Sequence, residues 1–141
     1  DRDFAKYHPG GALGKQLYLK VSDLSDQNGK PEVSPEASVR QIIITITQFR
    51  LGATAVIDQG TILGIITDGD IRRMLETHDD LSHITAKDIM GKSPKLIDKN
   101  ELAVNALHQM KDNNISQLLA TENGKYAGIV HIQDLLKEGI I

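Results

Sequence analysis

The chain has 141 residues, of which 40% are hydrophobic, so it can close one core of ordinary size, whereas either half alone would be marginal. With a net charge of −3 and no basic run longer than Arg72-Arg73, we expect no nucleic-acid partner, and no apolar run approaches the roughly 18 residues of a membrane span. Because cysteine is absent, there is neither a disulfide framework nor a thiolate metal site, and we expect a cytoplasmic protein without metal or cofactor.

Residues 1–20 are predicted to be a connector rather than a domain. Pro9-Gly10-Gly11 and Gly14 would break any helix there, and the apolar residues keep no sustained period. The chain begins with Asp1 instead of methionine, and its first residues do not resemble a signal peptide. We therefore expect a piece cut from a longer protein.

The next element is ambiguous on propensity alone. Residues 42–47 are mostly β-branched, which favours a strand. The matching segment 103–111, however, is rich in good helix formers and has its apolar residues at helical spacing. The match predicts a helix in both places, with Ile42, Ile43 and Ile46 on one face, and either Ser38 or Glu36 is a candidate N-cap.

Each predicted helix is followed by two short apolar runs separated by a turn that contains glycine. This pattern indicates a β-hairpin. A second helix follows in each copy, at 70–76 and 133–137, so that each unit reads strand, helix, strand, strand, helix, and residues 77–86 link the units. The apolar runs are 54–57 and 62–67 in the first copy and 118–121 and 126–131 in the second.

The strongest feature of the sequence is an internal repeat. The segment Gly64–Ile71 recurs as Gly128–Leu135, 64 residues later. A period of this size is too long for a solenoid and suits a small unit that buries its open face against a twin. We expect an α+β fold of two βαββα repeats, 21–80 and 81–141, packed with pseudo-twofold symmetry, and a functional site between them.

These residues carry a resemblance to a known family. A βαββα unit that ends in Gly, two apolar residues, Thr or Ser, two variable residues and Asp resembles the CBS domain, and a tandem pair resembles a Bateman module. The resemblance covers Val21–Gly139. It implies that a nucleotide or a nucleotide conjugate binds between the two units.

Two residues of the first copy carry the chemistry that such a ligand needs. The carboxylate of Asp70, at a helix start, is suited to accept hydrogen bonds from vicinal ribose hydroxyls, and the Thr67 hydroxyl can reach the sugar or a phosphate. The second copy retains Asp134 but has His131 in place of the hydroxyl. The two sites should therefore differ, and we expect one occupied site, on the Thr67 and Asp70 side, with His131 facing across the cleft.

Each of these residues also has a purely structural interpretation. Both aspartates are at helix starts, where Asp is a common N-cap, and a lone histidine such as His131 is more often packed or hydrogen-bonded than a ligand contact. Arg72 and Arg73 are candidates to neutralise a ligand phosphate, although exposed helix charges need no such role. Gly64 and Gly128 are most simply positions of close approach in a strand.

The connector carries a second resemblance. The run from His8 to Gly14, and also Thr67–Arg73, resemble bacterial D-arabinose 5-phosphate isomerases, in which such a run joins a sugar isomerase (SIS) domain to a CBS pair. That family interconverts D-ribulose 5-phosphate and D-arabinose 5-phosphate, which supplies 3-deoxy-D-manno-octulosonate (Kdo) for lipopolysaccharide or capsule.

The isomerase resemblance implies a catalytic role for His8. Aldose-ketose isomerisation moves a proton between adjacent carbons, and an imidazole is suited to this at neutral pH. The alternative is an ordinary linker histidine before a proline turn. Because the sequence has no sugar isomerase domain, we expect the fragment to be inactive alone, and whether it is part of an enzyme depends on what precedes it.

The function predicted from the sequence is that of a regulatory CBS pair. The expected partners are a nucleotide or nucleotide sugar, with CMP-Kdo as a candidate, the protein's own isomerase domain, and further copies of the chain in a homo-oligomer. One alternative is a structural dimerisation module without a physiological ligand. Another is a general adenylate-sensing pair attached to a different enzyme.

Overall fold

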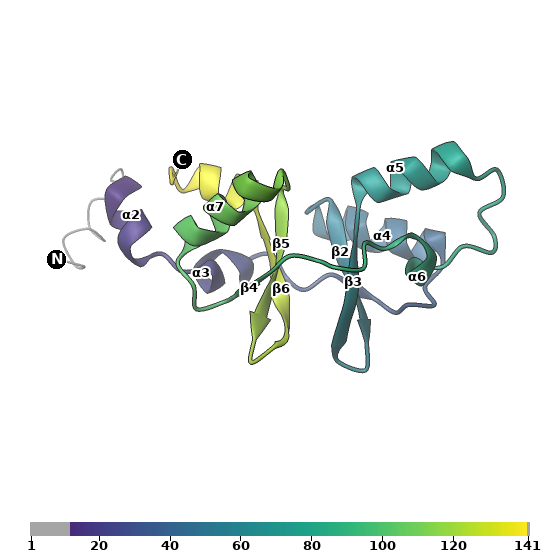
Figure 1. Ribbon diagram of the computed structural model, residues 1–141, viewed down its shortest axis with the longest axis horizontal. Coiled ribbons are helices and arrows are strands. Elements are labelled where there is room, and N and C mark those ends of the chain that lie inside the picture. Colours follow the sequence, from purple (N-terminus) through teal and green to yellow (C-terminus); the bar gives the residue numbers. More distant parts are fainter. Residues whose placement is uncertain (1–11, 141) are drawn as a thin grey trace. The chain divides into compact units, whose positions relative to one another are not determined.

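The fold is α+β, as the sequence predicted, in a computed structural model that describes residues 12–140 (Figure 1). Internal contacts divide the chain into two compact units. The continuous unit comprises residues 29–95, and the split unit comprises the residues up to 28 together with those from 96 onward. Each unit contains one three-stranded sheet, and each sheet includes a hairpin of its last two strands (Figure 1).

The continuous unit has the sheet order β1-β2-β3, in which β1 pairs parallel with β2, and β2 pairs antiparallel with β3. One helix, α4, follows β1, and another, α5, follows β3, so the predicted order of strand, helix, strand, strand, helix is confirmed. The elements are β1 (Glu32–Val33), α4 (Val39–Phe49), β2 (Ala53–Asp58), β3 (Thr61–Thr67), α5 (Asp68–Thr77) and the short helix α6 (Ala86–Ile89).

The split unit repeats this order with the sheet β4-β5-β6, again parallel and then antiparallel. Two further helices come from the N-terminal part of the chain. The elements are α2 (Ala12–Tyr18), α3 (Val21–Ser25), β4 (Leu96–Asp98), α7 (Ala103–Asn113), β5 (Gln117–Glu122), β6 (Lys125–His131) and α8 (Ile132–Lys137).

The β-branched segment forms a helix, α4, as the repeat predicted. Ser38 is its N-cap, because its hydroxyl accepts a hydrogen bond from the Gln41 amide at 3.2 Å while the Gln41 side chain accepts one from the Ser38 amide at 2.8 Å. This reciprocal capping box satisfies two otherwise unpaired backbone donors. The helix ends at Phe49, and its C-cap, Arg50, has a left-handed backbone with φ 60°.

The face of α4 that carries the apolar residues is only partly covered. Ile42 and Ile46 belong to the core of the continuous unit, but Ile43 is 41% exposed. At the matching position of α7, Leu107 is only 4% exposed and packs in a core cluster with Ile140. The repeat therefore predicted the helix correctly, but it gave no sign that one copy leaves this position open.

Each short helix packs in the unit formed by the strands of the other repeat. The α3 helix lies at the start of the first repeat, yet the Val21 amide donates to the Glu101 carbonyl at 2.9 Å, in the split unit. The Ala86 amide of α6 makes the matching bond to the Ala37 carbonyl at 2.9 Å, in the continuous unit. The predicted repeat boundaries thus describe the sequence period, whereas compact packing groups the short helices differently.

Candidate ligand-binding sites

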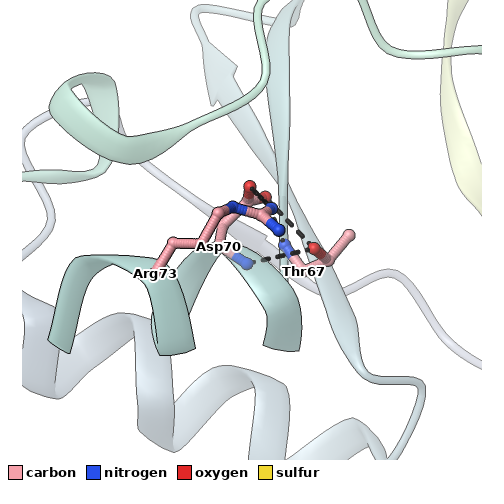
Figure 2. A network of polar contacts seen from close by, with 3 residues as sticks. All are labelled: Thr67, Asp70 and Arg73. Atoms are coloured by element: carbon pink, nitrogen blue, oxygen red, sulfur yellow. Dashed lines mark hydrogen bonds and ion pairs between the residues drawn. The ribbon is translucent and has the colours of Figure 1, made fainter. Parts of the chain in front are cut away.

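The start of α5 brings together two of the residues predicted for the first site (Figure 2). Asp70 Oδ2 accepts hydrogen bonds from the Thr67 amide at 2.9 Å and the Thr67 hydroxyl at 3.2 Å. The Asp70 amide in turn donates to the Thr67 hydroxyl at 3.4 Å. Threonine at the N-cap and aspartate at the third helical position therefore form a capping box, which fixes both side chains at the end of β3.

Arg73 extends this cluster from the next turn of the helix. Its Nη2 donates to Asp70 Oδ1 at 2.7 Å, so both oxygens of Asp70 are occupied (Figure 2). The Arg73 side chain is 68% exposed and that of Asp70 is 18% exposed. Arg72 is exposed and makes no polar contact with Thr67 or Asp70 among the described residues. Of the two arginines, only Arg73 belongs to the cluster.

The start of α8 holds the two residues predicted for the second site. Asp134 Oδ2 accepts a hydrogen bond from the His131 amide at 2.8 Å, as Asp70 does from Thr67. His131 takes the position of Thr67 in the repeat and, like Thr67, caps the helix with its side chain. Its Nδ1 accepts a hydrogen bond from the Gln133 amide at 3.0 Å. With Nδ1 as an acceptor, a neutral His131 carries its proton on Nε2 and presents a donor there.

Burial lowers the pKa of His131 below its ordinary value of 6.5, and Lys137 acts in the same direction, while the Asp134 carboxylate raises it. Burial is the largest of these influences, so the neutral imidazole is favoured. A neutral ring keeps Nδ1 available for the Gln133 amide. Protonation would put a second N–H at this position and break the bond to the helix.

Asn28 is the site residue that the sequence did not indicate. Its Nδ2 donates to Asp134 Oδ2 at 2.8 Å and to the Ile129 carbonyl at 2.9 Å. The amide therefore ties the turn after α3 to both β6 and α8, within the split unit. Asn28 lies in a segment rich in Asp, Gln, Asn and Gly, which is typical of a turn, and no local spacing in the sequence points to a partner 106 residues away.

In the continuous unit, a backbone amide takes the place of the Asn28 side chain as the donor to the matching carbonyl. The Ile65 carbonyl, which matches that of Ile129, accepts from the Gly91 amide at 2.8 Å. At Gly64 a Cβ would collide with the Gly91 carbonyl oxygen and would lie 2.8 Å from the Met90 sulfur. The prediction that Gly64 marks a close approach is confirmed, because only a residue without a side chain leaves room for this segment.

His8 lies outside the described residues, so its catalytic role stays a prediction. Among residues 12–140 there is no group of His, Asp and Glu side chains that could hold a metal ion. In the same part of the chain, no helix combines the length and the apolar character that crossing a membrane requires.

A surface hollow of about 600 Å³ lies on α4, where the sequence predicted no site. Its apolar lining comes from Val39, Ile43, Ile44 and Leu81. Ile43 and Ile44 are 41% and 52% exposed, so in this hollow the continuous unit presents aliphatic side chains to solvent. The run of three consecutive isoleucines was the available signal, because one helix face cannot bury all three.

Curated relatives similar to the chain are arabinose 5-phosphate isomerases. The chain is 40% identical to "Arabinose 5-phosphate isomerase KdsD" of Yersinia pestis, over 99% of this chain and 43% of that protein. It is also 40% identical to the protein of that name from Francisella tularensis, over 97% of this chain and 42% of the relative. The chain thus spans less than half the length of these relatives.

Solved structures agree on the fold. A conserved protein from Pyrococcus horikoshii matches with a TM-score of 0.75 and 26% identity, over 87% of this chain and 93% of that chain. A structure titled CBSX2 in complex with AMP matches with a TM-score of 0.70 and 20% identity, over 86% of this chain and 96% of that chain. The model of the CBS domain matches twice, at residues 21–77 and 86–140. The chain belongs to the CBS domain family, of which it carries two copies in tandem.

Proposed function

We propose that the chain is the regulatory, ligand-binding CBS pair of a D-arabinose 5-phosphate isomerase and that it binds a nucleotide or a nucleotide sugar. The observation that carries this proposal is the repeated placement of an aspartate at the start of α5 and of α8. Asp70 and Asp134 are each held by the backbone amide three residues earlier, at 2.9 and 2.8 Å. Both carboxylates are thereby fixed at the end of a strand, where they can receive the hydroxyls of a ribose.

The chemistry of a vicinal diol suits these carboxylates. Two adjacent hydroxyls donate in parallel to the two oxygens of one carboxylate, and a charged acceptor strengthens both hydrogen bonds. Asp134 Oδ1 accepts no hydrogen bond from a described residue, and His131 offers a donor at Nε2 when neutral. The AMP complex of a similar CBS structure supports a ribose-containing ligand.

The proposed regulated activity is the interconversion of D-ribulose 5-phosphate and D-arabinose 5-phosphate by an attached isomerase domain. The similarity to isomerases more than twice as long as the chain supports this assignment. His8 is the candidate catalytic residue within the whole enzyme. CMP-Kdo is the candidate ligand, because an activated end product is a sensible feedback signal and its cytidine ribose offers a diol. Regulation requires that the ligand bind two states of the enzyme with different affinity.

Calorimetry of the chain with CMP-Kdo, AMP and ATP tests the proposal. We expect heat of binding with at least one ligand, and no heat at millimolar concentration with any of the three would overturn the proposal. Loss of binding in Asp70→Ala but not Asp134→Ala would assign the site to the first copy, and the reverse would assign it to the second.

A matched control for these variants is present in the chain. Asp88 caps α6 through Thr85 with the geometry of Asp70 and Thr67, since its Oδ2 accepts from the Thr85 amide at 2.8 Å and from the Thr85 hydroxyl at 3.1 Å. Asp88→Ala therefore removes an equivalent cap without touching a candidate site. We expect this variant to bind ligand as the unaltered chain does.

A structural dimerisation module is the second candidate, and the exposed apolar face of α4 favours it. Ile43 and Ile44 line the hollow of about 600 Å³, and a second copy of the chain is the proposed partner. Size-exclusion chromatography with and without ligand separates the candidates. A scaffold should give an oligomer that is independent of ligand and that Ile44→Ser dissociates.

A further inference from the structure

The two candidate aspartates differ in the hydrogen-bond partners that their carboxylate oxygens already have. Asp70 uses both oxygens, because Oδ2 accepts from Thr67 and Oδ1 is held by Arg73 Nη2 at 2.7 Å. Asp134 uses only Oδ2 among the described residues. The position of Arg73 is taken in the second copy by Lys137, which makes no ion pair with Asp134 in the described part of the chain. The difference therefore comes from one guanidinium.

We infer that Arg73 determines ligand specificity at Asp70 by excluding neutral diols and admitting diols that carry a phosphate. This inference rests on the proposed function. A diol that donates to both oxygens of Asp70 must first displace Arg73 from Oδ1. A nucleoside offers the displaced guanidinium no new partner, whereas a nucleotide offers a phosphate, which the planar guanidinium can bind with two parallel hydrogen bonds.

The exposure of the two side chains makes this exchange feasible. Arg73 is 68% exposed and can leave without disturbing the core, whereas Asp70 is 18% exposed and stays fixed by Thr67. The guanidinium lies over Gly69, since a Cβ there would be 3.3 Å from Nη1 and 3.5 Å from Nη2 of Arg73. The absence of a side chain at position 69 thus leaves room for the guanidinium next to the carboxylate.

The strength of the ion pair sets the size of the expected effect. Exposed ion pairs such as that of Arg73 and Asp70 contribute little to stability. A diol that must break this pair should therefore bind about twofold to fivefold more weakly. A phosphate that gains the guanidinium should strengthen binding about tenfold, as expected for charge-assisted hydrogen bonds. AMP should therefore bind at Asp70 at least about tenfold more tightly than adenosine.

Titration of the ¹⁵N-labelled chain with AMP and with adenosine tests the inference, since the amide of Gly69 reports on the first copy and that of Gln133 on the second. In Arg73→Ala we expect adenosine to bind about twofold to fivefold more tightly at the Gly69 reporter and AMP to bind more weakly, so that the preference for AMP collapses. Arg73→Gln, which keeps a polar side chain of similar length on α5, should give the same change and guards against a local effect of alanine.

The control variant is Lys87→Ala, which removes one positive charge and one exposed ion pair, to Glu36 at 3.1 Å, from the same unit. It should leave the preference for AMP unchanged. Equal affinities for AMP and adenosine at Gly69, or a preference that survives both Arg73 variants, would overturn the role of Arg73 and leave the proposed function standing. No response to either ligand at millimolar concentration at both reporters would overturn this inference. If CMP-Kdo and ATP also gave no response, the proposed function would be overturned with it.

Discussion

Ile43 and Leu107 occupy the same position of the internal repeat, but Ile43 is 41% exposed and Leu107 is 4% exposed. Leu107 packs in a cluster that includes Ile140, which is itself 1% exposed. Ile43 instead lines the hollow on α4. The two copies therefore use one helix position for different purposes, as part of a core in one unit and as a surface in the other.

This difference in burial predicts different costs for truncating the two side chains. Leu107→Ala removes buried methyl groups and leaves a cavity, so it should lower the free energy of unfolding by about 2–5 kcal/mol. Ile43→Ala removes groups that are already partly hydrated and should cost less than about 1 kcal/mol. Urea denaturation of both variants checks the prediction, and equal losses would contradict the assigned burial.

Gly64→Ala should be destabilising because the new Cβ would collide with the Gly91 carbonyl and approach the Met90 sulfur. Backbone must shift to relieve the collision, and overpacking of this kind costs about 1–3 kcal/mol. Gly69→Ala is the matched control, since its Cβ would meet the flexible end of Arg73 and would lie at an ordinary contact distance of 3.6 Å from the Thr67 hydroxyl. Alanine favours a helix over glycine, so thermal unfolding of the control should shift upward or stay unchanged.

Asn28→Ala should lower the free energy of unfolding by about 1–3 kcal/mol, because it removes a half-buried amide that donates to both the Ile129 carbonyl and Asp134 Oδ2. Asn105→Ala is its control in the same unit, since Asn105 donates to Glu101 at 3.1 Å on the exposed surface of α7. The control should change the stability by less than about 0.5 kcal/mol. If the two variants unfolded at the same urea concentration, the bridging role of Asn28 would be wrong.

His131 should make the stability of the chain depend on pH. Its pKa is lowered in the folded chain, chiefly by burial, so the unfolded chain binds the proton more readily. The stability that the folded chain gains from a neutral His131 is therefore fully present above the ordinary pKa of 6.5. This stability is lost as the pH falls through that value toward the lower folded pKa. Unfolding measured from pH 8 to pH 5 should show this loss.

His131→Asn is the variant that isolates this effect. Asparagine can still accept from the Gln133 amide at an N-cap, but it does not titrate. The variant should therefore keep the helix cap and lose a part of the pH dependence between pH 8 and pH 5. Curves of identical shape for the two proteins would show that His131 does not titrate differently on folding.

The order of helices and strands was predictable because the repeat supplies two different sequences for each element, so that one copy can decide where the other is ambiguous. The β-branched run from Ile42 to Thr47 favours a strand when taken alone, and its helical counterpart corrected that preference. The aspartates at the helix starts were likewise predictable from local spacing. Local rules sufficed wherever the interacting residues lie within one turn of each other, as in the capping box of Thr67 and Asp70.

Contacts between distant segments were not predictable in the same way. Asn28 gave only a turn signal, and its partners are more than 100 residues away. The choice between Arg72 and Arg73 was open to a local rule instead, because residues three positions apart on a helix are neighbours, as Asp70 and Arg73 are, and residues two positions apart are not. Leu107 packs in a cluster that includes Ile140, which lies 33 residues further along the chain, whereas Ile43 is 41% exposed. Such differences arise from tertiary packing, which a repeat can only suggest.

The placement of α3 in the split unit also has a consequence for the order of folding during synthesis. All of the continuous unit emerges from the ribosome before the residues from 96 onward do, and its contacts can then form without the rest of the chain. The split unit must wait, because α3 is synthesised early and its partners Lys99 and Glu101 come much later. A nascent chain that has emerged from the ribosome only as far as residue 95 should therefore hold one folded unit and an α3 segment that still lacks its sheet.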